Sequence, residues 1–186
     1  SPLRHRAVCY TSVMKGPEGK FRIAPSKERP QEQTENLDAM IVIPAMNEGE
    51  KIIDTIYAAV HQKPFKDQEH RHGIVVVINN RPTSDHGVKL GNFRTYLLLQ
   101  ALEHKFPISL RGDKTFTDKV KAIQEQNIPI HVVDSFSDEY ASPDSNVGRA
   151  RRIGTEYALS KVKQEGFIVS TDADTVLNNH LIGAAK

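Results

Sequence analysis

The chain has 186 residues, of which 38% are hydrophobic and 26% are charged, and this composition indicates an ordinary globular protein and excludes a disordered one. Its 25 basic and 23 acidic residues leave a net charge of +2, which gives no electrostatic case for a nucleic-acid partner. No apolar run approaches the roughly 18 residues of a membrane span. The single cysteine, Cys9, excludes an intrachain disulfide framework and favours a reducing, cytoplasmic location.

The first part of the chain, residues 1–36, is polar and is interrupted repeatedly by proline and glycine. Residues 31–36 show no apolar period at all. We predict an N-terminal extension here, with one short strand at Val8–Val13. The remaining residues, 37–186, are predicted to form one α/β domain.

The first element of this domain is a continuous apolar run, Ala39–Ile43, which is typical of a strand buried on both faces of a parallel sheet. Pro44 ends this strand. Asn47 is predicted to cap the helix that follows, and the apolar spacing continues the helix to about His61. A second buried strand, Gly73–Ile78, completes a β-α-β unit with parallel strands.

The later elements continue this alternation of helices and strands. In chain order we predict a loop at 80–89, helices at 92–104 and 115–126, a strand at 130–134, a loop at 135–145, a helix from an Asn146 cap to about Lys161, a strand at 166–171 and a helical turn near Asn178. Apolar strands that alternate with helices predict an α/β fold. We expect an open, mostly parallel, Rossmann-like sheet with helices on both faces.

Two carboxylates, Asp172 and Asp174, follow the last apolar strand. In extended backbone, residues two apart point to the same face, so both side chains are expected to project together from the strand's carboxyl end. Neighbouring anions are stabilised by a hard divalent cation such as Mg²⁺ or Mn²⁺, although a solvated turn is the simpler interpretation of the tripeptide. Parallel sheets bind ligands at the carboxyl edge, where Pro44, Asn79-Asn80 and Asp134 are also expected.

Several classes of function compete for this edge. A dinucleotide-binding domain and a phosphate-loop NTPase are excluded, because neither glycine-rich signature occurs. The run Asp172–Leu177 resembles the first motif of the phosphohydrolases with an aspartyl nucleophile, in which Asp172 attacks phosphorus and Asp174 acts as acid and base. That family carries the motif on its first strand, and its later motifs have no place in the residues after Leu177. A non-catalytic nucleotide-binding domain is a further alternative.

Four segments, in order along the chain, resemble the inverting nucleotide-sugar glycosyltransferases of family 2, whose fold is called GT-A. They are Ile41–Glu48, Val75–Asn80 with Ser84-Asp85 behind it, Asn146–Gly154, and Phe167–Asp174. Each falls at a strand end or a helix start. Asn79-Asn80 stands where this family has paired acids, and an asparagine can both donate and accept hydrogen bonds at a base edge.

The resemblance implies a glycosyltransferase that moves a sugar from a nucleoside-diphosphate sugar to an unknown acceptor with inversion. Mn²⁺ or Mg²⁺, held by the Asp-x-Asp carboxylates Asp172 and Asp174, would stabilise the diphosphate leaving group. The implied nucleotide-sugar-binding residues are Pro44, Ala45, Asn47, Glu48, Asn79, Asn80, Arg151, Asp172 and Asp174. In this family the acceptor-binding half and the catalytic base follow the Asp-x-Asp segment, so we expect the donor-binding portion here and the base beyond Lys186.

Overall fold

A computed structural model gives the structure of the chain and describes residues 10–15, 21–25, 35–63, 70–108 and 113–184. The chain divides into two compact units, residues 1–35 and 36–186. In the first unit, β1 (Tyr10–Lys15) and β2 (Phe21–Pro25) form an antiparallel hairpin. The sequence predicted a strand at Val8–Val13, whose first two residues lie outside the described residues. It missed β2, in which apolar and polar residues alternate only briefly.

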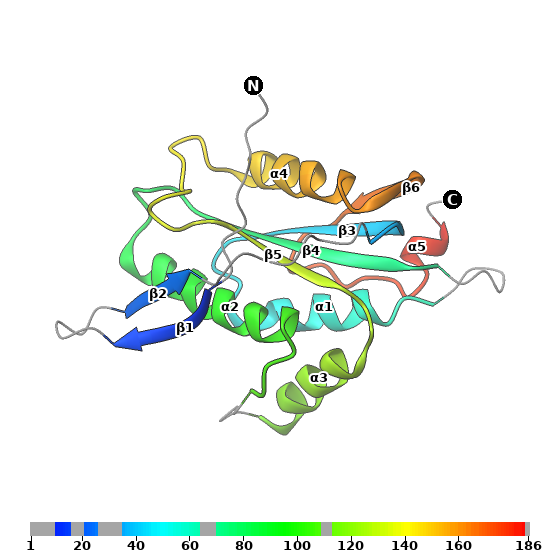
Figure 1. Ribbon diagram of the computed structural model, residues 1–186, viewed down its shortest axis with the longest axis horizontal. Coiled ribbons are helices and arrows are strands. Elements are labelled where there is room, and N and C mark those ends of the chain that lie inside the picture. Colours follow the sequence, from blue (N-terminus) through cyan, green and yellow to red (C-terminus); the bar gives the residue numbers. More distant parts are fainter. Residues whose placement is uncertain (1–9, 16–20, 26–34, 64–69, 109–112, 185–186) are drawn as a thin grey trace. The chain divides into compact units, whose positions relative to one another are not determined.

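The second unit is built on one four-stranded sheet (Figure 1). Its strands are β3 (Leu37–Ala45), β4 (His72–Asn79), β5 (Ile130–Ser135) and β6 (Val162–Ser170). They lie in the order β5-β4-β3-β6, and all three pairings are parallel. The strand order therefore reverses at β3, with β4 and β5 on one side of it and β6 on the other.

Helices cover both faces of this sheet (Figure 1). The helices of this unit are the 3-10 turn η1 (Gly49–Lys51) and the α-helices α1 (Ile52–Val60), α2 (His86–Glu103), α3 (Lys114–Glu125), α4 (Val147–Leu159) and α5 (Leu181–Ala184). α4 packs on β3, β4 and β6 from one face. α1 and α2 pack from the other face, and α3 lies against α1. The predicted open parallel sheet with helices on both faces is confirmed.

Successive side chains of a strand alternate between the two faces of the sheet, so the continuous apolar runs of β3 and β4 make both faces apolar. On the face of α4, Met40 and Val42 of β3 join Val75 and Val77 of β4 in a buried cluster, and burying each such side chain contributes roughly 1.5–3 kcal/mol. α4 approaches closely at Gly154, where a Cβ atom would lie 2.4 Å from Val42 Cγ1. This contact fixes the position of α4 against β3.

The start of α2 differs from the prediction. The helix begins at His86 and not at Asn92, because the Asp85 side chain caps it by accepting a hydrogen bond from the Val88 amide at 2.9 Å. The predicted loop before it is correspondingly shorter. α3 starts one residue from its predicted position, with Asp113 as its cap.

The last strand also differs from the prediction. A strand was expected at 166–171, whereas β6 begins at Val162 and lies at the edge of the sheet. Its side chains are half-buried or exposed. An apolar run predicts a strand, but it does not distinguish an edge position from a central one, because that depends on which strands pair.

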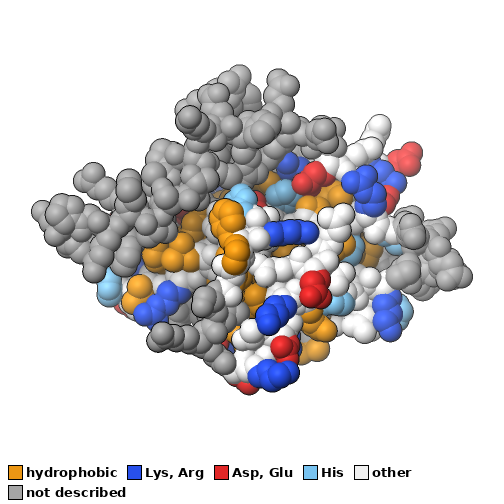
Figure 2. All heavy atoms as spheres, turned by 60° about the horizontal axis from the view of Figure 1, so that its bottom comes forward, with side chains coloured by type: hydrophobic (Ala, Val, Ile, Leu, Met, Phe, Trp, Pro, Cys, Tyr) orange, Lys and Arg blue, Asp and Glu red, His pale blue; other side chains and the backbone are white. Residues whose placement is uncertain are grey.

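The described surface carries mixed charge. In the described part of the face shown in Figure 2, Lys and Arg side chains are interspersed with Asp and Glu side chains. Ion pairs on α1 and α3 join Lys119 to Asp54 at 2.7 Å and Lys114 to Asp118 at 2.8 Å. Among the described helices, none is long and apolar enough to cross a membrane.

Candidate functional site

The strands end at one edge of the sheet, as predicted. Ala45 pairs with Ile78 and Val42 pairs with Ser170, while β5 ends beside Asn79. The residues that follow each strand therefore come together. Ligands of doubly wound sheets bind at this edge, near the point where the strand order reverses, and here that point lies at β3.

The loop after β3 turns at Asn47, which has the left-handed φ of 59°. The prediction that Asn47 caps the following helix is wrong, since a cap residue has extended backbone and Glu48 occupies the position before the helical turn. The Asn47 amide instead donates to Asn92 Oδ1 at 2.7 Å. Pro44 and Ala45 are buried behind this turn, Asn47 is exposed and Glu48 is half-buried.

The end of β4 carries two buried carboxamides, that of its last residue Asn79 and that of Asn80 directly after it. Asn79 is 3% exposed, its Nδ2 donates to Ser145 Oγ at 3.2 Å, and its Oδ1 has no hydrogen-bond partner among the described residues. Asn80 is fully buried, donates to Arg81 O at 2.9 Å and accepts from Asn92 at 3.4 Å. An unpaired buried acceptor costs about 1–3 kcal/mol, so a ligand donor at Asn79 Oδ1 would be stabilising. Asn80 has partners inside the protein, and its contact with a ligand stays a prediction.

Asp172 and Asp174 lie in a turn after β6, which we call the aspartate turn (Asp172–Thr175). The Thr175 amide donates to Asp172 O at 3.2 Å, and Ala173 is buried while both aspartates are exposed. Thr55 of α1 holds this turn from inside, because its hydroxyl donates to Ala173 O at 2.5 Å. The two carboxylates were expected on one face of an extended strand end. That expectation is wrong, since the strand ends before Asp172 and the chain turns there.

Three carboxylates influence one another electrostatically at this place, and one guanidinium pairs with one of them. Burial raises the pKa of the Glu48 carboxyl, and the nearby anions of Asp174 and Asp172 raise it further. Arg151 of α4 donates to Asp172 Oδ1 at 2.5 Å. The structure thus brings together Glu48, Asp172, Asp174 and Arg151, which come from three separate segments. Their roles in binding stay predictions.

The residues present suit a divalent cation that is shared with a ligand. Among the described residues, no group of three His, Cys, Asp or Glu side chains is arranged to hold a metal ion by itself. Mg²⁺ and similar ions are, however, commonly bound by one or two carboxylates together with phosphate oxygens. The mutual repulsion that helps raise the pKa of Glu48 is relieved by a cation. Asp172 and Asp174 are the side chains that would hold it.

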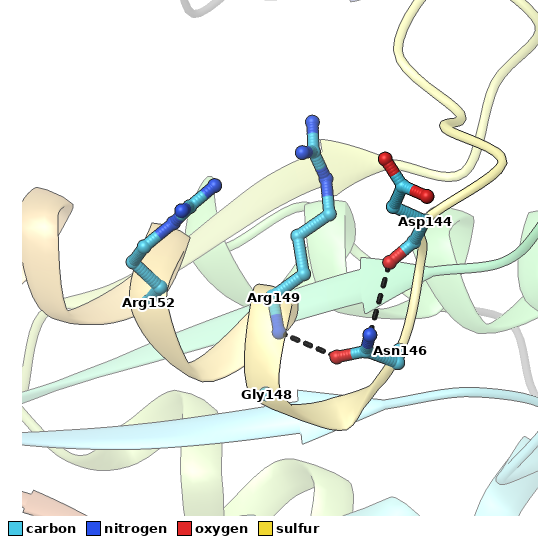
Figure 3. Close-up of a pocket in the computed structure, with 5 residues that line it drawn as sticks. All are labelled: Asp144, Asn146, Gly148, Arg149 and Arg152. Carbon is cyan, nitrogen blue, oxygen red and sulfur yellow. Dashed lines mark hydrogen bonds between the residues drawn. The ribbon is translucent and has the colours of Figure 1, made fainter.

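The N-terminus of α4 starts at the same edge and carries a shallow hollow. As predicted, Asn146 caps this helix, accepting from the Arg149 amide at 2.8 Å and donating to Asp144 O at 3.0 Å (Figure 3). The hollow, of about 310 Å³, is lined by Asp144, Asn146, Gly148, Arg149 and Arg152. The arginine side chains extend outward from the helix (Figure 3). Two cations at a helix N-terminus give a positive potential that favours anionic groups nearby.

Comparisons of the chain with protein-family models, with curated proteins and with solved structures each found no match. A fold of this kind supports many chemistries, so the function has to be argued from the side chains at the sheet edge.

Three residues that hold the site together were not predicted. Asn92 joins the loops after β3 and β4, Thr55 holds the aspartate turn, and Ser145 contacts Asn79. Two of them had a signal in the sequence. Thr55 lies among the buried isoleucines of α1, and Asn92 lies one helical turn before buried Tyr96. A polar side chain on the apolar face of a helix needs a buried partner, and only the folded structure shows which one.

Proposed function

We propose that this chain binds a nucleoside-diphosphate sugar together with Mn²⁺ or Mg²⁺ and is the donor-binding part of an inverting glycosyltransferase. The observation that carries the proposal is the pair between Arg151 and Asp172 at the carboxyl edge of the sheet, where the charges of Asp174 and Asp172 also act on Glu48. Carboxylates that hold a cation, with an arginine beside them, form a site suited to a diphosphate. The order of the four segments that resemble this family also supports the proposal.

Each segment has a role in this proposal. The cation, when bound, supplies Lewis-acid stabilisation to the departing diphosphate. Asp172 and Asp174 hold the cation, and Arg151 turns from Asp172 towards the phosphate oxygens, with which a guanidinium can form paired hydrogen bonds. Pro44 and Ala45 shape the nucleoside side of the site, and Asn79 faces the base.

No residue of the described chain is assigned as the catalytic base. An inverting displacement needs a carboxylate to take the proton of the acceptor hydroxyl. Asp134 lies at the same edge, but its Oδ1 accepts hydrogen bonds from the Phe136 and Ser137 amides, both at 3.0 Å, and so forms a turn. The acceptor is unknown, and a cytoplasmic location stays a prediction from the single cysteine.

Calorimetric titration tests the proposal directly. UDP, GDP and their sugar conjugates are titrated into the protein with Mn²⁺ and again with EDTA. We expect binding that depends on the metal. Absence of binding by every one of these ligands in Mn²⁺ would overturn the proposal.

Two other functions give different results in simple assays. A phosphohydrolase that uses Asp172 as nucleophile would form a beryllofluoride adduct on that residue, which mass spectrometry of the trapped complex or fluorine NMR detects. We expect no adduct, because the Asp172 carboxylate is paired with Arg151 and is not free to act as a nucleophile. The strand before it, β6, also lies at the edge of the sheet. A non-catalytic domain would bind the donor but would neither hydrolyse nor transfer its sugar.

A further inference from the structure

Asn92 of α2 has a fully buried polar side chain, and both the oxygen and the nitrogen of its carboxamide form hydrogen bonds. Its Oδ1 accepts the Asn47 amide at 2.7 Å. Its Nδ2 donates to Asn79 O at 3.3 Å and lies 3.4 Å from Asn80 Oδ1. One side chain thus connects the loop after β3 with the loop after β4.

The contact with Asn47 is reinforced by the neighbouring residue. A Cβ atom on Gly91 would lie 2.5 Å from Asn47 Oδ1, so the Asn47 side chain lies against α2 at Gly91, and a larger residue there would displace the end of that side chain. Asn47 is also one of the few described non-glycine residues with a positive φ. Such a conformation is sparsely populated and persists when its surroundings fix it. Asn92 and Gly91 supply those surroundings.

A carboxamide is suited to this task in a way that an apolar residue is not. It presents an acceptor and two donors in one plane, so it can satisfy an amide of one loop and carbonyl oxygens of another together. Burying it is costly unless these bonds form, so the contacts hold both loops in one arrangement. Glu48 directly follows Asn47, and Asn79 is the predicted base contact.

We propose that Asn92 is a positioning residue that sets the Asn47-Glu48 turn against the end of β4. Its consequence for ligands rests on the proposed function: without Asn92, Glu48 and Asn79 no longer stand in the arrangement that receives the donor. Asn92 itself touches neither the donor nor the cation.

Two readouts on Asn92→Ala test this role. Native-state hydrogen exchange measured by NMR should show the Asn47 amide exchanging about tenfold faster or more, because it loses its acceptor. Calorimetry in Mn²⁺ should show nucleotide affinity about tenfold weaker. The matched control is Thr95→Val, which removes the partly buried hydrogen bond from the buried Thr95 Oγ1 to Gly91 O at 3.0 Å within α2, without touching either loop. It should change neither readout at a temperature where the protein is folded.

A second variant keeps the test valid if Asn92→Ala does not fold. Gly91→Ala leaves the buried carboxamide in place and favours the helix, but its methyl group displaces the Asn47 side chain. We expect a folded protein with nucleotide affinity reduced by about threefold. Unchanged affinity in a folded Asn92→Ala or, if that variant is unfolded, in Gly91→Ala would overturn the role, as would an equal loss in Thr95→Val. If the unaltered chain binds no nucleotide, the proposed function fails, and the exchange of the Asn47 amide alone decides the role of Asn92.

Discussion

The two halves of the candidate site are held in place by different kinds of contact. The loops after β3 and β4 are joined through the fully buried Asn92, whose hydrogen bonds to the end of β4 are buried and whose bond with the Asn47 amide is partly buried. The aspartate turn is tied to α1 by one buried hydroxyl, that of Thr55. On its outer side it is held by the pair between Arg151 and Asp172, whose side chains are 42% and 52% exposed.

The nucleoside side of the site is therefore formed before a ligand binds, whereas the aspartate turn has to change its partners. Buried hydrogen bonds in a low dielectric are strong and costly to lose, so the loops after β3 and β4 are preorganised. An exposed ion pair contributes only about 0–1 kcal/mol and exchanges easily for another partner. We therefore expect the nucleoside side of the site to bind without rearrangement, while the aspartate turn exchanges Arg151 for a cation.

The largest effect is expected from Asp174→Ala. This change removes one of two carboxylates proposed to hold the cation, and metal-dependent nucleotide affinity should fall by roughly a hundredfold, about 2.7 kcal/mol. Calorimetry with and without Mn²⁺ measures it. Asp138→Ala is the control, since this exposed aspartate lies in the loop after β5. A Kd within twofold of the unaltered protein would show that the turn holds no cation.

Thr55→Val should loosen the aspartate turn without touching its carboxylates. The loss of the hydroxyl leaves the Ala173 carbonyl without its donor, and the free energy of unfolding should fall by about 1–3 kcal/mol. Urea denaturation gives this value, and Mn²⁺-dependent nucleotide affinity should weaken as well. An unchanged stability would mean that Thr55 does not hold the turn.

Arg151→Gln distinguishes the aspartate turn that is paired with Arg151 from the aspartate turn that holds a cation. Without the guanidinium, Asp172 is free for a cation, so Mn²⁺ alone should bind about threefold tighter, while nucleotide in Mn²⁺ binds more weakly. Stability should change by less than about 1 kcal/mol, because the pair is exposed. Electron paramagnetic resonance of free Mn²⁺ measures the first effect, with Arg94→Gln as a control on α2. Weaker binding of Mn²⁺ alone would contradict the exchange of partners.

Glu48→Gln should have the smallest effect, and one that depends on pH. Burial, with the charges of Asp174 and Asp172, raises the pKa of Glu48 in the folded chain above its unfolded value. The folded state then binds the proton more tightly, so stability falls as pH rises from the ordinary glutamate range through the raised pKa. Glu48→Gln should abolish this loss and be slightly more stable at neutral pH, with the difference vanishing in acid. Denaturation curves from pH 4 to 8 test the sign, and a less stable variant at neutral pH would contradict it.

Much of the fold is predictable because its signals are local. The apolar runs in β3 and β4 are long enough to indicate buried parallel strands, and Asn146 precedes α4 as a cap that needs only its own helix. The expectation of polar residues at the carboxyl edge follows from parallel strands alone. These features depend on neighbours in sequence or on a general rule of the fold.

The remaining features depend on contacts between distant residues. Asn47 lies 45 residues from its acceptor Asn92, and no local pattern indicates that this contact prevents it from capping a helix. Thr55 lies 118 residues from Ala173. The same limit explains why the edge position of β6 was not predicted, since it follows from the strand order and not from the residues of β6.

Paramagnetic broadening by Mn²⁺ in the NMR spectrum of the amide-labelled protein with UDP or GDP would locate the cation and so test the proposed donor and metal site. We expect strong broadening at residues 46–49 and 171–175, which lie at the same edge of the folded sheet. With Mn²⁺ and no nucleotide the broadening should be weaker and should increase in Arg151→Gln. Broadening centred elsewhere, or none with either nucleotide, would contradict a donor and metal site at this edge.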